Sequence, residues 1–171
     1  KDSLMKIHAL TFIAASLFAV SSLAQSPGAP PAIYKPSAEV VAELDQAESA
    51  GASAGGSSVS ISPGISVRRR SSSVLQYAVL HPWSVEIYRI LEGSGTLVTG
   101  GKLILPLAES TNPNIVRTRN GVEGGLARRV SAGDILVLQP GTPHWFSSID
   151  GESITYMESR VRISTHAIQY Q

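Results

Sequence analysis

The chain of 171 residues contains no cysteine, which excludes a disulfide framework and thiol chemistry. Charged residues make up only 16% of it, and the 14 basic residues nearly balance the 13 acidic ones. It also contains no Gly-rich phosphate loop, no dinucleotide-binding fingerprint and no nucleophile elbow. The near-neutral charge argues against binding to nucleic acid or to a membrane surface, and the missing motifs argue against nucleotide chemistry and Ser-His-Asp hydrolysis.

The N-terminal segment is typical of a signal peptide. Lys6 precedes a short apolar run over residues 9–20, and Ser22-Leu23-Ala24 matches a small-residue cleavage site. A run of this length is too short to span a bilayer. The pattern predicts a signal peptide over residues 1–24, a secreted or periplasmic protein, and no membrane attachment after cleavage. Its removal leaves twelve basic and twelve acidic residues in the mature chain.

The next part of the chain, residues 25–58, reads as a leader. It begins with a segment rich in proline and alanine, continues with a short helix that Ser37 is expected to cap and that runs through Ala47, and ends in a Gly/Ser linker over residues 51–58. From Val59 onward, short β-rich runs alternate with glycine-containing turns. This pattern predicts a single all-β sandwich or barrel domain over residues 59–171.

Two segments of this β-rich region resemble the two conserved motifs of the cupin superfamily, as found in small secreted bacterial cupins. Glu86 is followed after six residues by Gly93, which matches the first motif. Gly133, Gly141 and His144 have the spacing of the second motif, and the two motifs occur in the family's order. The resemblance covers residues 60–165 and implies an antiparallel jelly-roll β-barrel that often forms a homodimer.

The resemblance also implies a metal site. Cupins usually carry two histidines, one residue apart, shortly before the motif-one glutamate, whereas this chain offers only His81 there. Counted as the second histidine, His81 leaves Val79 in the first position. Counted as the first, it leaves Trp83 in the second. The implied ligands are His81, Glu86 and His144, a donor set suited to iron, manganese, zinc or nickel.

Side chains alternate between the two faces of a strand, and this alternation predicts which residues line the interior. Tyr88 shares a face with Glu86, and Phe146 shares a face with His144. Glu86 is therefore a candidate metal ligand or catalytic acid/base, with an outward-facing carboxylate as the alternative. Tyr88 is either a packing residue or a catalytic proton donor.

Several basic residues and one long segment have readings of their own. The run of three arginines over residues 68–70 is predicted to be a solvated edge strand, since charge there discourages unwanted pairing. One of Arg128 and Arg129 points inward if their strand is central, where it could bind an anionic substrate. The polar segment over residues 106–123 is either a loop that covers the site or a disordered insertion.

Together these features predict an exported cupin that binds a divalent metal and a small organic molecule inside the barrel. Oxygenases, isomerases and lyases all occur on this fold, so the reaction type does not follow from it. The alternative is a metal-free barrel that captures a small molecule such as a sugar.

Overall fold

The computed structural model describes residues 28–51 and 56–163. The predicted signal peptide over residues 1–24 lies outside this part of the chain. Contacts between Cα atoms divide the chain into residues 1–32 and 33–171. Of the first unit, residues 28–32 are described and form neither helix nor strand. All the elements below belong to the second unit.

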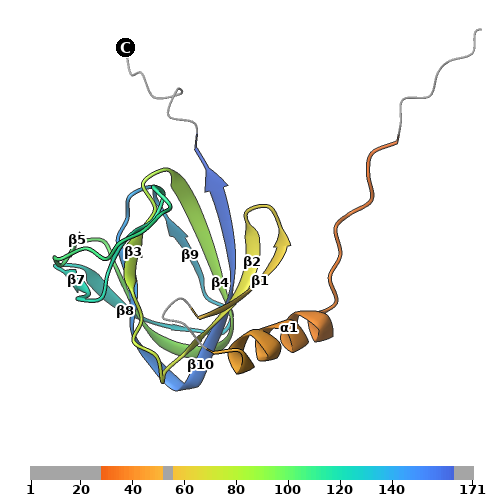
Figure 1. The fold of residues 1–171 in the computed structure, drawn as a ribbon, viewed down its shortest axis with the longest axis horizontal. Coiled ribbons are helices and arrows are strands. Elements are labelled where there is room, and N and C mark those ends of the chain that lie inside the picture. Colours follow the sequence, from red (N-terminus) through yellow and green to blue (C-terminus); the bar gives the residue numbers. More distant parts are fainter. Residues whose placement is uncertain (1–27, 52–55, 164–171) are drawn as a thin grey trace, which may run out of the picture. The chain divides into compact units, whose positions relative to one another are not determined.

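Helix α1 spans Ser37–Ser49. Its N-cap is Pro36, and no side chain caps the helix, so the prediction that Ser37 caps it is wrong: Ser37 is the first helical residue. Leu44 is the buried residue of the helix. The carboxylates of Asp45 and Glu48 face β2, where both pair with Arg69. The helix is thereby joined to the outer side of the sheet, next to β1 and β2 in Figure 1.

The strands pair antiparallel throughout, which confirms the all-β prediction. Their bounds are β1 Ser57–Ser62, β2 Ile65–Ser71, β3 Ala78–Leu80, β4 Ser84–Thr99, β5 Lys102–Leu103, β6 Val116–Thr118, β7 Val122–Glu123, β8 Leu126–Ser131, β9 Ile135–Leu138 and β10 His144–Arg162. Eight strands form one sheet along the path β1-β2-β10-β3-β6, with β4 joining β10 to β8 and β9. Strands β5 and β7 form a separate pair.

The strands curve around a common interior, as Figure 1 shows. The architecture is that of a jelly roll, but hydrogen bonding between the described strands does not close it into a complete barrel, because the pairing path ends at β1, β6, β8 and β9. Among the described residues, no helix has both the length and the apolar character that a membrane span requires.

Two long strands, β4 and β10, organise the sheet. Turn residues within them predicted separate short strands, yet each strand continues through its glycines. Gly95 pairs with Ile149, and the ladder between β4 and β10 absorbs the irregularity in register shifts between Phe146 and Ser148 and between Asp150 and Tyr156. Such bulges bend a strand without ending it. The bent β4 and β10 therefore contribute to both the core and the site.

The interior faces follow the predicted alternation. On β4, Glu86, Tyr88 and Ile90 are buried, while Arg89 and Leu91 between and after them are exposed. The hydrophobic core lies farther along the same interior, and its members are Tyr88, Ile90, Leu97, Val130, Leu138, Phe146, Ile154 and Tyr156. Polar side chains thus gather at one end of an otherwise apolar interior.

Candidate metal centre

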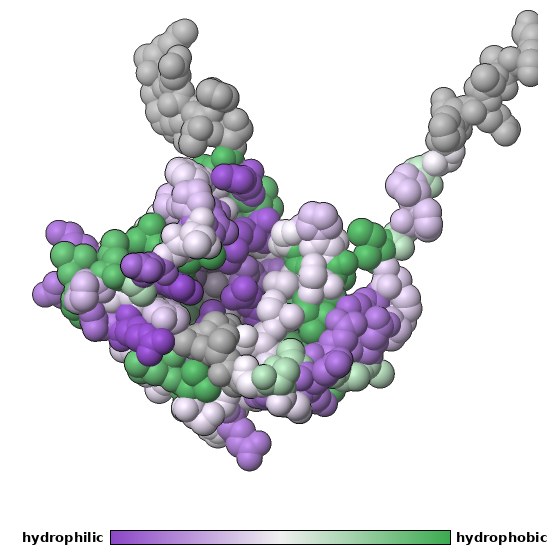
Figure 2. Space-filling view, viewed as in Figure 1, coloured by the Kyte–Doolittle hydropathy of each residue, from purple (hydrophilic) through white to green (hydrophobic). Residues whose placement is uncertain are grey.

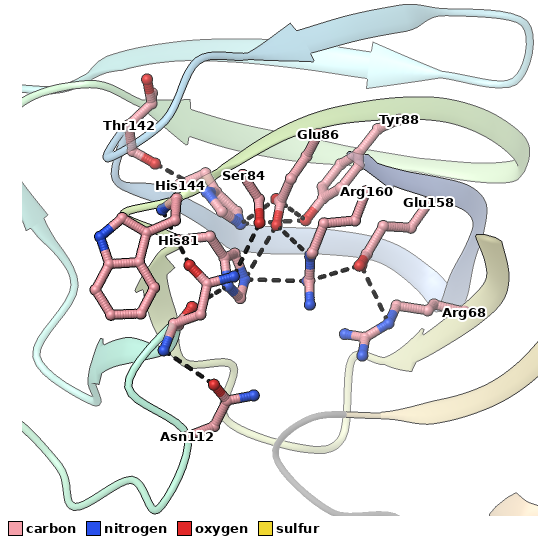
Figure 3. Close-up of polar contacts among 12 residues, drawn as sticks. Arg68, His81, Ser84, Glu86, Tyr88, Asn112, Thr142, His144, Glu158 and Arg160 are labelled. Atoms are coloured by element: carbon pink, nitrogen blue, oxygen red, sulfur yellow. Dashed lines mark hydrogen bonds and ion pairs between the residues drawn. The ribbon is translucent and has the colours of Figure 1, made fainter. Parts of the chain in front are cut away.

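His81, Glu86 and His144 are brought together by three separate segments of the chain. His81 lies between β3 and β4, Glu86 is near the start of β4, and His144 is the first residue of β10. One donor atom from each lies within 4.8 Å of the others, and all three residues are buried. Figure 3 shows the three side chains converging on one point, with Tyr88 and Arg160 beside them.

The orientation of His81 is set by the segment that the sequence left open as loop or disorder. Its Nδ1 lies 2.6 Å from the backbone carbonyl oxygen of Asn114. A carbonyl can only accept, so Nδ1 carries the proton and Nε2 keeps its lone pair. The Asn114 side chain is itself held, because its Oδ1 accepts from the Trp83 backbone N–H at 3.0 Å and its Nδ2 donates to Ser84 Oγ at 2.8 Å. The segment over residues 106–123, which also contains β6 and β7, therefore positions a site residue.

His144 is held in the same way from the other side. Its Nδ1 donates to the backbone carbonyl of Thr142 at 3.0 Å, which leaves Nε2 as the bare nitrogen facing the centre. The turn before it contains Gly141, whose φ of +74° favours glycine and explains this motif position. Backbone carbonyls that fix the outer nitrogen of a histidine are the usual support for a metal-binding imidazole.

Both histidines are neutral at pH 7. Burial lowers the pKa of His81 to about 4, against the opposing attraction of Glu86. Burial also lowers the pKa of His144 to about 4. Their Nε2 atoms therefore present lone pairs, and these face the Glu86 carboxylate at 3.1 Å from His81 and 3.3 Å from His144.

Glu86 is only 1% exposed, and its charge is countered by an arginine from a distant part of the sequence. The register between β4 and β10 places Arg160 directly opposite Glu86. Arg160 donates from Nε to Glu86 Oε1 at 2.8 Å, and its Nη2 donates to His81 Nε2 at 3.1 Å. The guanidinium therefore satisfies the half of the centre formed by His81 and Oε1.

The other half of the centre has fewer protons than acceptors. Tyr88 is the donor there, with its hydroxyl 3.2 Å from Glu86 Oε2 and 3.1 Å from His144 Nε2. Burial raises the pKa of Tyr88 well above 10, so the hydroxyl keeps its proton at neutral pH. A single proton serves only one of these two acceptors at a time. An electron-rich pair, Oε2 and Nε2, thus shares one hydrogen, which is an arrangement that favours a cation.

A second ion pair extends from the centre along the interior. Glu158 Oε1 binds Arg160 Nη2 at 2.6 Å, and Glu158 Oε2 lies 3.1 Å from Arg68 Nε. The Arg68–Glu158 contact is close in distance but is not aligned as a hydrogen bond, since neither atom has a hydrogen-bond partner. Figure 3 shows the resulting row of charges from Glu86 through Arg160 and Glu158 to Arg68.

The structure also corrects two readings of the arginines. The run over residues 68–70 is not a solvated edge: β2 lies between β1 and β10, Arg70 is only 7% exposed, and Arg68 faces Glu158. Arg128 and Arg129, by contrast, are both exposed on β8, so neither points inward. Sequence reasoning missed Arg160, Glu158 and Asn114. The only available signal was the shared strand parity of residues 156, 158 and 160, which cannot identify the facing strand.

The donor set fits a divalent metal ion. With bonds of about 2.1 Å, neighbouring ligand atoms lie roughly 3.0–3.4 Å apart in octahedral or tetrahedral geometry. The Glu86 oxygens lie 3.1 and 3.3 Å from the two Nε2 atoms, which agrees with that range. Three protein donors also leave coordination positions open, as catalytic metal sites require. This buried group could therefore bind a metal, and its donors do not select one metal identity.

Comparison with known proteins gives likenesses of fold. No protein-family model matches the chain, and no curated protein matches it. Among solved structures, it resembles a cupin protein from Bacteroides fragilis at 18% identity and a TM-score of 0.35, over 63% of this chain and 70% of that one. It resembles an oxalate oxidase at 16% identity and a TM-score of 0.41, over 82% of this chain and 71% of that one.

A third neighbour is the cupin domain of CENP-C from Drosophila melanogaster, with 14% identity and a TM-score of 0.36. The match covers 57% of this chain and 60% of the CENP-C chain. Cupin proteins are thus among the solved structures that resemble this chain, in agreement with the family resemblance of its two motifs.

Proposed function

We propose that this protein binds one divalent metal ion through His81, Glu86 and His144, next to a cavity that accepts a small organic molecule. The observation that carries the proposal is the shortage of protons around Glu86 Oε2 and His144 Nε2, which share the Tyr88 hydroxyl as their donor. A divalent cation would satisfy both lone pairs at once. The carbonyl bonds to Nδ1 of each histidine support the same reading, because they aim both Nε2 atoms at one point.

A bound divalent ion would supply Lewis acidity to a ligand at its open positions. The residues of the chain would have distinct roles around it. Tyr88 holds a proton on its hydroxyl within reach of the centre and is the candidate proton donor, while the neutral histidines act as ligands. Arg160 balances the Glu86 charge and makes the ion compete for Oε1. Whether oxygenase, isomerase or lyase chemistry follows depends on the ligand, not on these residues alone.

The experiment measures metal stoichiometry and affinity. The mature chain is stripped with EDTA, dialysed, and titrated calorimetrically with Mn²⁺, Zn²⁺ and Ni²⁺, and anaerobically with Fe²⁺. We expect one ion per chain, and loss of binding in both Glu86→Gln and His144→Ala. The matched control is Glu92→Gln, which removes an exposed carboxylate from the same strand. Circular dichroism of each variant separates lost binding from lost folding.

A second candidate function is favoured by Arg160. Its guanidinium already neutralises Glu86 and hydrogen-bonds His81, so the centre has an internal cation. A barrel of this kind needs no metal and would bind a small molecule, such as a sugar, without catalysis. A folded wild-type protein that binds none of the four metals supports this alternative and overturns the metal proposal.

Export and self-association are separate proposals. The signal-peptide pattern supports a secreted or periplasmic location, and mass spectrometry of the protein from the culture medium or periplasm tests it, with Gln25 expected as the first residue. The family resemblance supports a homodimer, which sedimentation equilibrium tests. A monomer at micromolar concentration would overturn that expectation.

A further inference from the structure

The arginine run on β2 divides its charges between two sides of the sheet. Arg69 points outward, where its Nη1 lies 2.6 Å from Asp45 and 3.3 Å from Glu48 on α1. Arg68 and Arg70, two residues apart, point to the interior, as strand alternation requires. Two guanidiniums are thus carried into the jelly roll, where burying a charge is costly unless something compensates it.

These arginines line a cavity of about 290 Å³ beside the metal centre. It is bounded by β1, β2 and β3, by residues near β6, and by Arg160 of β10. Figure 2 shows hydrophilic side chains gathered around a hollow on this face of the molecule. The charged residues that line the cavity are Arg68, Arg70, Arg117 and Arg160, and no aspartate or glutamate of the described chain is among its lining residues.

The positive charge of the cavity exceeds its compensation. The two carboxylates behind its wall, Glu86 and Glu158, both pair with Arg160, and Glu158 also lies against Arg68. Four guanidiniums therefore face two carboxylates, and the neighbouring histidines are neutral. The Arg68–Glu158 contact lacks hydrogen-bond alignment at Arg68 Nε, so it leaves that donor unused.

Arg117 is the second arginine with spare charge. Its Nε and Nη2 donate to the backbone carbonyl oxygen of Glu109, which is neutral, at 3.2 and 2.9 Å. Its guanidinium stacks 4.7 Å from the ring centre of Tyr77, which holds the planar group in place. Val79 and Ile115 provide apolar wall between these charges. A planar fork beside apolar surface matches a carboxylate attached to a hydrocarbon body.

We propose that this cavity binds a small organic carboxylate, whose charge is countered by Arg68 and Arg117 and whose body lies against Val79 and Ile115 towards His81. The inference rests on the proposed use of the jelly roll as a small-molecule site, but it does not need the metal. The modest cavity volume restricts the ligand to a small acid, since sites for drug-sized ligands run to about 1,000 Å³.

The experiment uses EDTA-treated mature protein, so that carboxylate binding is measured without metal. Benzoate and succinate are titrated calorimetrically against their neutral isosteres, benzamide and succinamide, and against inorganic phosphate. We expect at least one of the two acids to bind at least tenfold more tightly than its amide and more tightly than phosphate. We also expect that affinity to fall at least tenfold in Arg68→Gln and in Arg117→Gln.

The control variant is Arg128→Gln, which removes the same charge from an exposed position on β8 and should leave affinity unchanged. Arg68→Lys keeps the charge but loses the bidentate fork, so it should bind with intermediate affinity. If Arg68→Gln fails to fold, the half-buried Arg117 carries the test alone. Equal affinity for acid and amide, stronger binding of phosphate, or full binding by folded Arg117→Gln would each overturn the carboxylate proposal. Metal binding is measured separately, so either proposal can fail without the other.

Discussion

Replacing Arg160 with glutamine tests whether an internal cation tunes the metal centre. In the wild-type protein, Arg160 Nε donates to Glu86 Oε1 at 2.8 Å, and its Nη2 donates to His81 Nε2 at 3.1 Å. A divalent ion that binds these two atoms must displace both hydrogen bonds. Each ligand interaction gained by the ion is therefore offset by an interaction lost from the guanidinium.

The size of this effect follows from the bonds involved. A hydrogen bond to a charged group contributes about 1.5–3 kcal/mol, which corresponds to a factor of about 10–150 in a binding constant. Arg160 keeps its second partner, Glu158, at 2.6 Å when it leaves Glu86, so the lower end of the range applies. We expect Arg160→Gln to bind divalent metal about tenfold more tightly than the wild-type protein.

The variant should also be less stable without metal. Removing Arg160 leaves the buried Glu86 carboxylate without its cation, and breaking a buried ion pair from one side costs about 3–5 kcal/mol. Urea unfolding in EDTA measures this loss. Added metal stabilises a protein according to the ratio of its concentration to its dissociation constant, so the variant should gain more stability from the same metal concentration.

The control is Arg162→Gln on the same strand. Arg162 is exposed and stacks 5.6 Å from the ring centre of Trp83, away from the Glu86 carboxylate. Calorimetric titration of both variants and the wild type gives the three dissociation constants. Equal or weaker metal binding by a folded Arg160→Gln variant would refute the competition argument, and an equal gain in Arg162→Gln would reduce it to a general charge effect.

Three further outcomes are expected. In EDTA, the free energy of unfolding should fall as the pH drops from 6.5 to 4, by up to roughly 3 kcal/mol for each of His81 and His144, because the unfolded chain takes up protons that the buried imidazoles refuse at a pKa of about 4; urea titrations at pH 4.5, 5.5 and 7 measure this, and constant stability would contradict it. Tyr88→Phe should lose about 1–2 kcal/mol of stability by urea unfolding, yet bind metal no more weakly, because the lost proton was shared between two metal ligands; a large loss of affinity would show that Tyr88 does more than satisfy them. Gly95→Ala should destabilise the sheet by about 1–3 kcal/mol in thermal unfolding, since its Cβ would lie 2.5 Å from the backbone oxygen of Ser148, whereas Gly28→Ala, with open space around it, should be neutral.

Much of the site was predictable because its signals are local. Strand alternation has a period of two residues, so the buried face shared by Glu86 and Tyr88 could be read from their spacing. The same rule placed His144 and Phe146 together. Glycines of the second motif have positive φ, +98° at Gly133 and +74° at Gly141, and such positions favour glycine for reasons of backbone geometry alone.

Other features depended on which strands become neighbours. Arg160 meets Glu86 across 74 residues of sequence, because the register between β4 and β10 sets them opposite each other. A shift of that register by one residue would turn Arg160 to the other face. The long strands also continue through glycines that predicted turns, because bulges and pairing on both sides outweigh local turn preference.

The sequence by itself determined the all-β pattern, the two motifs and the identity of the three candidate metal ligands. Only the tertiary structure decided that Asn114 holds His81, that Arg160 neutralises Glu86, and that Arg68 and Arg70 face a cavity instead of solvent. The reason is physical: periodicity and turn geometry are properties of neighbouring residues. Charge compensation in a closed interior depends on contacts between strands that are distant in the chain.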